Sequence, residues 1–327
     1  MTDPRDRPAP PPDQGVKVGA TIGVRPEALL DDIETVRELA LHHVRITLSW
    51  AETQPRQGAL DGGAIENIRS AAHTLREAGV AVWICLLSPE VPRWFENDGG
   101  FTDARHTGHW WPRWVEAAST ALGDEVDGWI PFEAPFAMAN RLVPNDPRRH
   151  GEVVDTLLVA WRDAWRILHG PAPIATSLDV RTITVPRDDV VAADIARRDD
   201  HLRWHTWLRA LRDGSITIPG RADRELHDLA GSCDVLGIAV SGGKDLDLEA
   251  LAQRTAEQGP DRPLAITFRP RGTQTTSAFE SAGHDHDIDE RAEATVDVLA
   301  DTRRLAATLP ITRFTTTDLD AYAHSVG

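Results

Sequence analysis

A single carboxylate, Glu133, lies at the end of a predicted strand in the segment "GWIPFEAPF" (128–136). A glutamate in such a position can act as a general base for a bound molecule, with burial raising its pKa. It can equally neutralise a buried arginine and have only a structural role. The next residue is Ala134, so no second acid stands beside it. Both roles of Glu133 stay open at the level of sequence.

Arg45 is the candidate partner of Glu133. In "HVRITLSW" (43–50) aliphatic residues alternate with polar ones. In a barrel, this period of two places the aliphatic side chains against outer helices and Arg45 inside. An arginine inside a barrel needs a carboxylate nearby, and we expect Glu133 to supply it. The alternative is an arginine on an edge strand that reaches solvent.

Further side chains at predicted strand ends could contact a ligand. Arg269 and Arg271 of "FRPRG" could hold a carboxylate or phosphate, or could be ordinary surface arginines. Trp50 could stack on a ligand or pack in the core. A second catalytic carboxylate would have to come from one of four acids near strand ends, namely Glu90, Asp179, Asp318 and Asp320.

We expect no metal and no cofactor. "AGHDHDIDER" (282–291) contains consecutive histidines and aspartates, but their spacing matches no known metal site, so a solvated loop is expected. Cys85 and Cys233 fall in apolar runs and are expected to be reduced core residues. The first predicted strand lacks the Gly-rich fingerprint of a dinucleotide-binding fold.

Composition narrows the class of protein. The 327 residues carry a net charge of −16, which argues against nucleic acid or an anionic membrane as a partner. Residues 1–15 are Pro-rich and lack the apolar stretch of a secretory signal, so we expect a disordered lead-in to a cytoplasmic, acidic protein.

The predicted elements repeat a strand and a helix eight times, with seven clear helical segments. This order favours an α/β fold, a single (β/α)8 TIM barrel over residues 16–327, rather than an open doubly wound sheet. The expected strands are 16–22, 43–50, 80–87, 128–132, 173–180, 234–240, 263–268 and 311–317. Amphipathic helices are expected at 27–41, 63–78, 152–169 and 288–308.

Several segments in the right order resemble the family 1 glycoside hydrolases, the β-glucosidase group. They are "HVRITLSW", "ALGDEVDGWIPFEAPF", "CDVLGIAVSG" and "RPLAITFRPRG", and the similarity runs from about residue 16 to 314. The resemblance implies a barrel of this family with shortened loops and a truncated C-terminal end. Arg45 and Trp50 match residues of the family's second strand.

The resemblance also implies that the retaining glycosidase machinery is lost. Without gaps, the family's acid/base glutamate falls on Ala134 and its sugar-binding asparagine on Glu133. The nucleophile glutamate falls on Phe268, and the histidine of the third strand on Ser88. A one-residue deletion would instead place Glu133 at the acid/base position. Retaining hydrolysis needs two carboxyl groups about 5–5.5 Å apart.

We therefore expect a degenerate active site whose pocket is used for binding a small molecule, sugar-like or anionic, or for non-glycosidic chemistry on it. The alternatives are a pseudoenzyme that acts as a scaffold or protein partner, and a residual O-glycosyl hydrolase with Glu133 as acid/base. A deep mouth lined by Glu133, Trp50 and Arg269 would favour the pocket. A mouth plugged by Phe268 and Phe132 would favour the scaffold.

Overall fold

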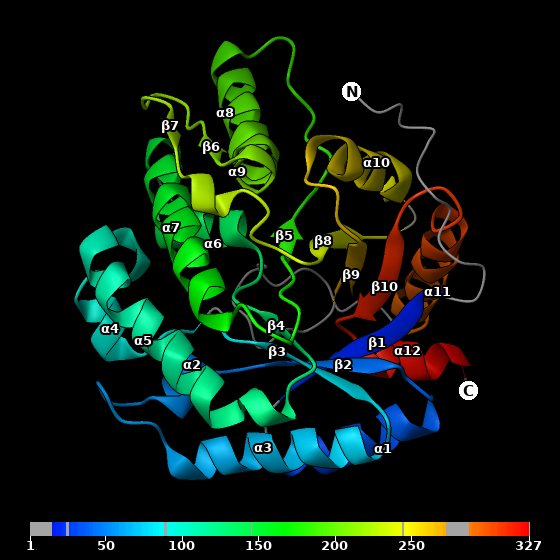
Figure 1. The fold of residues 1–327 in the computed structure, drawn as a ribbon. Helices are drawn as coiled ribbons and strands as arrows, with labels where there is room; N and C mark the ends of the chain where they lie inside the picture. Colours follow the sequence, from blue (N-terminus) through cyan, green and yellow to red (C-terminus); the bar gives the residue numbers. More distant parts are fainter. Residues whose placement is uncertain are drawn as a thin grey trace.

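The fold is an eight-stranded parallel barrel surrounded by helices (Figure 1). The computed structural model describes residues 15–23, 26–87, 90–144, 146–243, 245–272 and 288–326. The barrel strands are β1 (Lys17–Ile22), β2 (His43–Thr47), β3 (Ala81–Cys85), β4 (Gly128–Ile130), β5 (Leu178–Asp179), β8 (Leu236–Gly242), β9 (Leu264–Pro270) and β10 (Ile311–Thr316). They follow the order β4-β3-β2-β1-β10-β9-β8-β5 in the sheet.

Residues 173–175 join the two ends of this sheet. The Trp129 amide donates to the Pro173 carbonyl at 2.9 Å, and the Ala175 amide donates to the Trp129 carbonyl at 2.8 Å. Ala175 also bridges to Val235 in a parallel register. The chain from 173 to 179 thus occupies the fifth strand position, and the (β/α)8 barrel expected from the sequence is confirmed.

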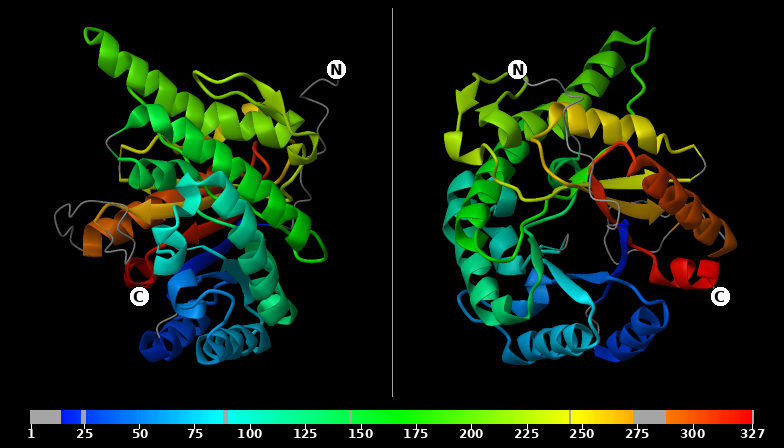
Figure 2. Two further views of the ribbon diagram at one scale, coloured as in Figure 1. Left: turned by 90° about the vertical axis from the view of Figure 1, so that its left-hand side faces the viewer. Right: turned by 45° about the vertical axis from the view of Figure 1, so that its right-hand side comes forward.

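Helices form the outer layer, as two further views show (Figure 2). The four predicted helices are found, and shorter ones lie between them. The helices are α1 (Pro26–Glu38), α2 (Trp50–Thr53), α3 (Gly62–Glu77), α4 (Arg93–Asn97), α5 (Ala104–Leu122), α6 (Pro135–Leu142), α7 (His150–Leu168), α8 (Val190–Asp200), α9 (Thr206–Asp213), α10 (Leu248–Gln258), α11 (Ile288–Leu305) and α12 (Leu319–Val326). A short hairpin, β6 (Ser215–Ile216) with β7 (Arg224–Glu225), follows α9. No described helix is long and apolar enough to cross a membrane.

Aspartate side chains set the start of several helices. Asp61 accepts from the Ala64 amide at 2.8 Å at α3, and Asp247 accepts from the Ala250 amide at 3.0 Å at α10. Each carboxylate satisfies an amide that has no partner within the helix and interacts favourably with the helix dipole. The turns that follow the strands therefore end at defined residues.

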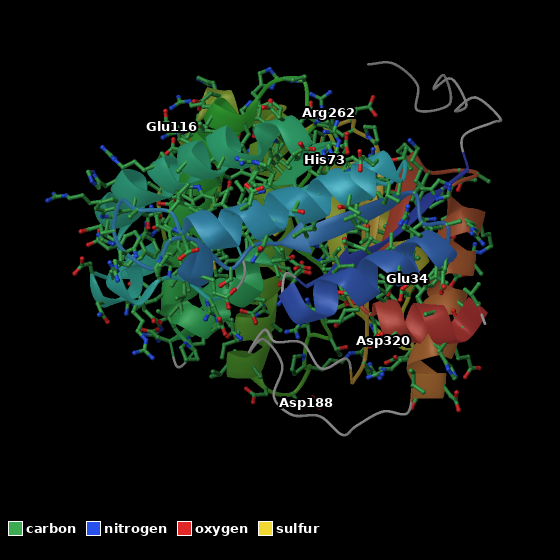
Figure 3. The ribbon with its side chains drawn as sticks, turned by 90° about the horizontal axis from the view of Figure 1, so that it is seen from below. Glu34, His73, Glu116, Asp188, Arg262 and Asp320 are labelled. Atoms are coloured by element: carbon green, nitrogen blue, oxygen red, sulfur yellow. The ribbon has the colours of Figure 1, made fainter. Side chains whose placement is uncertain are left out.

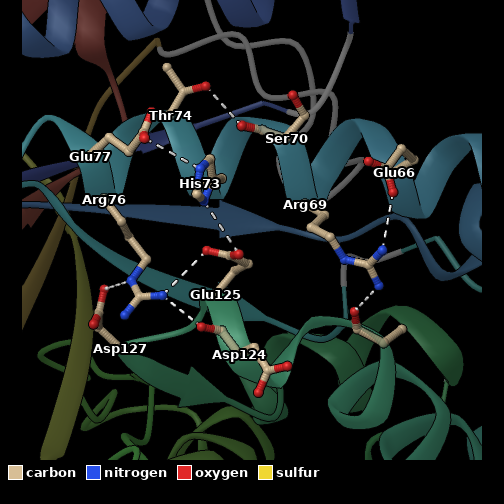
Figure 4. Close-up of polar contacts among 11 residues, drawn as sticks. Glu66, Arg69, Ser70, His73, Thr74, Arg76, Glu77, Asp124, Glu125 and Asp127 are labelled. Atoms are coloured by element: carbon tan, nitrogen blue, oxygen red, sulfur yellow. Dashed lines mark hydrogen bonds and ion pairs between the residues drawn. The ribbon is translucent and has the colours of Figure 1, made fainter.

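Charged side chains on the outer helices point to solvent. Viewed from below, Glu34 on α1, Glu116 on α5 and Asp320 on α12 lie on the outside of the molecule (Figure 3). On α3, Arg76 donates to the Asp124 carbonyl at 2.6 Å and pairs with Glu125 at 3.3 Å (Figure 4). These contacts tie α3 to the turn that precedes β4.

Two separate apolar layers fill the fold. The larger lies between the strands and the helices. A smaller cluster fills the barrel interior and comprises Trp83, Cys85, Ile130, Ala175 and Val235. Gly128 makes room for it, because a Cβ atom there would lie 2.4 Å from the Trp83 ring. Apolar side chains therefore fill part of the barrel interior, and in barrels of this kind the site lies at the carboxyl ends of the strands.

Candidate functional site

The side chains that point into the barrel at the carboxyl ends of the strands form its mouth. Arg45 comes from β2, Glu133 from the loop between β4 and α6, and Arg269 from β9. The Arg45 side chain is 2% exposed, whereas Glu133 and Arg269 are each 19% exposed. The Arg45 side chain is thus closed off from solvent, whereas Glu133 and Arg269 are partly accessible.

Glu133 is held between two guanidinium groups. Arg45 Nη2 donates to Glu133 Oε2 at 2.6 Å and also contacts Cys85 Sγ at 3.4 Å. On the other side, Arg269 Nη2 lies 3.8 Å from Glu133 Oε1, too far for a hydrogen bond. The expectation that Arg45 lies inside the barrel is confirmed, and Glu133 is its ion-pair partner.

The two arginines keep Glu133 ionised. Burial acts to raise the pKa of this carboxyl, but the charges of Arg45 and Arg269 and the hydrogen bond from Arg45 outweigh it, so the pKa lies below its ordinary value. A general acid must hold a proton at the working pH, and a carboxyl with a lowered pKa does not. A lowered pKa also makes Glu133 a weak base.

Ala134, aligned with the family's acid/base residue, has an unusual backbone. Its φ is +50° and its ψ +59°, the left-handed region, and Pro135 follows directly. Non-glycine residues are uncommon there, and such strain often occurs at functional sites. The Ala134 amide donates to the Ser177 carbonyl at 2.8 Å, which fixes this turn to the fifth strand segment.

Asp179, one of the four candidate second carboxylates, is fully engaged. It pairs with Arg203 and accepts from the amides of Phe136 at 3.0 Å and Ala137 at 3.1 Å, at the start of α6. The Arg203 guanidinium lies over the Phe136 ring at 4.4 Å. Arg203 was not anticipated from the sequence, because it lies in a polar helical stretch with no signal that it turns inward.

The other three acids are not placed as a catalytic partner either. Asp318 caps α12 by accepting from the Ala321 amide at 3.0 Å and lies 3.3 Å from Arg291. Glu90 and Asp320 are exposed. Among the described residues, no group of three or more His, Cys, Asp and Glu side chains could hold a metal ion. The histidines and aspartates of 284–287 lie outside the described residues.

Three side chains that the sequence offered for the mouth lie elsewhere in the structure. Phe268 is completely buried in the layer between sheet and helices, in register with Val240 of β8 and Thr316 of β10. The residues of β9 that face the barrel are instead Ala265, which contacts the interior cluster, Thr267 and Arg269. An inward Phe268 was expected because the family alignment gives a position but not a strand face.

Trp50 and Phe132 also lie outside the mouth. Trp50 is completely buried and stacks on Trp114 with ring centroids 5.5 Å apart. Phe132 contacts Trp161 of α7 and Trp207 of α9. Both serve core packing, which for Trp50 is one of the two roles that the sequence left open.

Arg271 faces away from the mouth. It is 59% exposed and pairs with Asp245 at 2.7 Å. It lines a separate cavity of about 390 Å³ at the rim, together with Gly242, Gly243, Asp245, Glu290, Arg291 and Ala294. Arg269 and Arg271 therefore have different roles although they are two residues apart. Ser88 lies outside the described residues.

Several buried polar groups of the inward-facing positions have no hydrogen-bond partner among the described residues. They are Thr21 Oγ1, Arg45 Nε and Nη1, Ser177 Oγ, Arg269 Nε and Thr317 Oγ1. Buried donors without protein partners are usually satisfied by ordered water or by a bound group. These groups, which we call the floor of the mouth, provide several hydrogen-bond donors. The Glu133 carboxylate lies among them, between Arg45 and Arg269.

Comparisons with known proteins show which sequences this chain is similar to. A sequence model of glycosyl hydrolase family 1 matches residues 27–143, about a third of the chain. Klotho from Homo sapiens is 27% identical over 148 residues, and Klotho from Mus musculus 26% identical. The match covers 42% of this chain but only 14% of each Klotho sequence.

Solved structures of the same type share the fold. The AHE enzyme from Alicyclobacillus herbarius superimposes with a TM-score of 0.74 at 16% identity, covering 93% of this chain and 88% of that one. A β-glucosidase from Exiguobacterium marinum gives 0.72 at 17% identity, covering 89% and 78%. The chain therefore has the (β/α)8 barrel fold of these structures, and its residues 27–143 are similar to glycosyl hydrolase family 1.

Proposed function

We propose that this protein is a non-hydrolytic member of the family 1 barrel type that binds a small polar molecule in its mouth. The observation that carries the proposal is the placement of Glu133 between Arg45 and Arg269. This arrangement leaves the Glu133 carboxylate ionised, with a positive charge on either side. It is suited to recognition by hydrogen bonds and charge rather than to proton donation.

The chemistry of glycoside hydrolysis argues against a catalytic role. Both the retaining and the inverting mechanism need a second carboxyl group on the opposite side of the sugar. The strand that carries the nucleophile in the family has no acid here, since β9 reads "LAITFRP". Asp179 is bound to Arg203 and to the start of α6, so it is not free to attack or to activate water.

The polar floor supports binding. The unpartnered groups of Thr21, Ser177 and Thr317 lie on β1, just before β5 and just after β10. A ligand with several hydroxyl groups could reach them directly or through water. The similarity to β-glucosidases is consistent with a sugar-like ligand.

Isothermal titration with neutral, carboxylated and phosphorylated monosaccharides tests this function, together with an assay on 4-nitrophenyl β-D-glucopyranoside. We expect saturable binding of at least one probe and no turnover. Turnover that disappears in Glu133→Gln would show a hydrolase instead. Failure of every probe to bind would contradict a ligand-binding mouth and favour the scaffold alternative.

The scaffold alternative has one observation in its favour. Val190 and Val191, at the start of the projecting helix α8, are 79% and 71% exposed (Figure 2). Exposed valines are also found singly on many soluble proteins, so this observation alone does not identify a partner. Capture of a partner that is lost in Val190→Ser/Val191→Ser would support this function over the first.

A further inference from the structure

We infer that the molecule bound in the mouth carries a carboxylate, and that Arg269 is the residue that recognises it. This inference rests on the proposed function and names the chemical class of its ligand. It follows from the balance of charge at the mouth, from the geometry of Arg269 and from the commitment of the other acids to partners of their own.

The charged side chains at the mouth carry a net positive charge, whereas the protein as a whole is strongly negative. Arg45 and Arg269 together carry two positive charges, and Glu133 supplies one negative charge between them. The chain has a net charge of −16, so an excess of positive charge at the mouth is contrary to the overall composition. In a partly buried site an uncompensated charge is costly, and an anionic ligand removes that cost.

Both arginines have unpartnered donors, but Arg269, 19% exposed, is more accessible than Arg45, 2% exposed. Arg45 donates a hydrogen bond of 2.6 Å to Glu133, whereas the nearest nitrogen of Arg269 lies 3.8 Å from the Glu133 carboxylate. The Nε of Arg269 has no hydrogen-bond partner among the described residues. A guanidinium group has two edges that match the two oxygens of a carboxylate, so Arg269 could bind one in a bidentate manner after a small rotation.

No other described acid neutralises Arg269. Asp179 is bound to Arg203, and Asp318 lies beside Arg291. Asp245, the acid nearest along the rim, pairs with Arg271 instead. Among the described residues, Arg269 therefore has only the long contact with Glu133, and an anionic ligand could supply a closer one. Because hydroxyl groups surround the floor, a small hydroxy acid such as a sugar acid satisfies both features.

D-glucuronate and D-glucose make a matched pair of probes, because they have the same ring hydroxyl groups and differ at C6, where only one carries a carboxylate. We expect D-glucuronate to bind the full-length protein at least about tenfold more tightly, the effect of one charge-assisted contact. Raising the salt concentration should weaken binding of D-glucuronate and leave that of D-glucose unchanged.

Two arginine variants locate the contact. Arg269→Gln should remove the preference for D-glucuronate, whereas Arg271→Gln, two residues along and outside the mouth, should keep it. Arg269→Lys should give an intermediate affinity, because it retains the charge but not the paired donors. Arg269→Lys also serves as the test if Arg269→Gln does not fold, as judged by its thermal unfolding.

The outcomes separate this inference from the proposed function. Equal affinity for the two probes would overturn the carboxylate inference and leave a ligand-binding mouth intact. Loss of the preference in Arg271→Gln as much as in Arg269→Gln would also overturn it. Binding of neither probe would refute the inference, and the wider panel of monosaccharides would then decide the proposed function.

Discussion

Arg45 Nη2 donates to Glu133 Oε2 at 2.6 Å, although the two residues are 88 positions apart in the chain. The contact joins β2 to the loop after β4 and passes over β3, whose Cys85 lies 3.4 Å from the same nitrogen. Burial raises the pKa of the Cys85 thiol, so it is a neutral neighbour. The centre of the mouth is therefore one ion pair rather than a pair of acids.

Removing Glu133 should destabilise the protein. Glu133→Gln leaves the Arg45 charge buried without its counter-charge, and we expect a loss of about 2–4 kcal/mol in the free energy of unfolding. This is somewhat below the range for a fully buried pair, because Glu133 is 19% exposed. Urea denaturation of both proteins at neutral pH measures the difference.

A second variant and a surface control make this prediction specific. Arg45→Met/Glu133→Gln should recover at least about 1 kcal/mol relative to Glu133→Gln, since no charge is then left unpaired. Glu66→Gln removes an exposed partner of Arg69 and should change stability by less than about 1 kcal/mol. A Glu133→Gln protein as stable as the wild type would show that the pair contributes nothing.

The sequence predicts the barrel from the repeated order of strand and helix, and the inward position of Arg45 from the period of two in its strand. A buried guanidinium also requires a counter-charge, which Glu133 supplies. The error at Phe268 came from following the family alignment instead of the strand pattern. In "LAITFRP" the large apolar residues Leu264, Ile266 and Phe268 alternate with smaller or polar ones, so the pattern itself indicates that Phe268 faces outward.

Other features could not be predicted from the chain. The Asp179–Arg203 pair depends on how the π-helical turn His201–His205 approaches β5, and no local pattern encodes that approach. Trp50 matches a family position, but its place in the core follows from the rings of Trp94, Phe95 and Trp114 around it. Contacts between residues far apart in the chain therefore determine where Arg203 and Trp50 lie.

The opposite faces of β9 should respond differently to substitution. Phe268→Gln places an amide in the apolar outer layer and should cost about 3–5 kcal/mol, as for the loss of a buried phenylalanine. Arg269→Gln acts at the partly exposed mouth and should cost less than about 1.5 kcal/mol. Denaturant unfolding of both variants is the measurement. A mild effect of Phe268→Gln would place that ring in the mouth after all.

Replacing Ala134 by glycine should relieve the backbone strain at this position. Since φ is +50° there, we expect Ala134→Gly to stabilise the protein by about 0.5–1 kcal/mol, despite the greater freedom of the unfolded chain. Ala40 also has a φ of +50°, just after α1, so Ala40→Gly should stabilise the protein by a similar amount. Ala139→Gly inside α6 should destabilise by about 1 kcal/mol. Thermal unfolding of the three variants compares them, and equal losses would mean that Ala134 is unstrained.

His43 should make stability depend on pH. Burial, with the charges of Arg313 and His42, lowers the pKa of this histidine from 6.5 to about 3, and its Nε2 contacts the Thr315 hydroxyl at 2.8 Å. Between pH 6.5 and 3 the unfolded chain binds a proton that the folded chain does not. The free energy of unfolding should therefore fall as the pH decreases, by about 1.4 kcal/mol per pH unit.

The measurement is urea unfolding at pH 7.5 and pH 5.0. The contribution of His43 over this range is about 2 kcal/mol, because the unfolded histidine gains its proton only below about pH 6.5. Glu133 does not contribute here, since its lowered pKa affects stability only below the ordinary value of 4.5. His43→Gln should reduce the loss by that amount, whereas His73→Gln, on the surface of α3, should not. An unchanged loss in His43→Gln would mean that His43 is protonated in the folded protein.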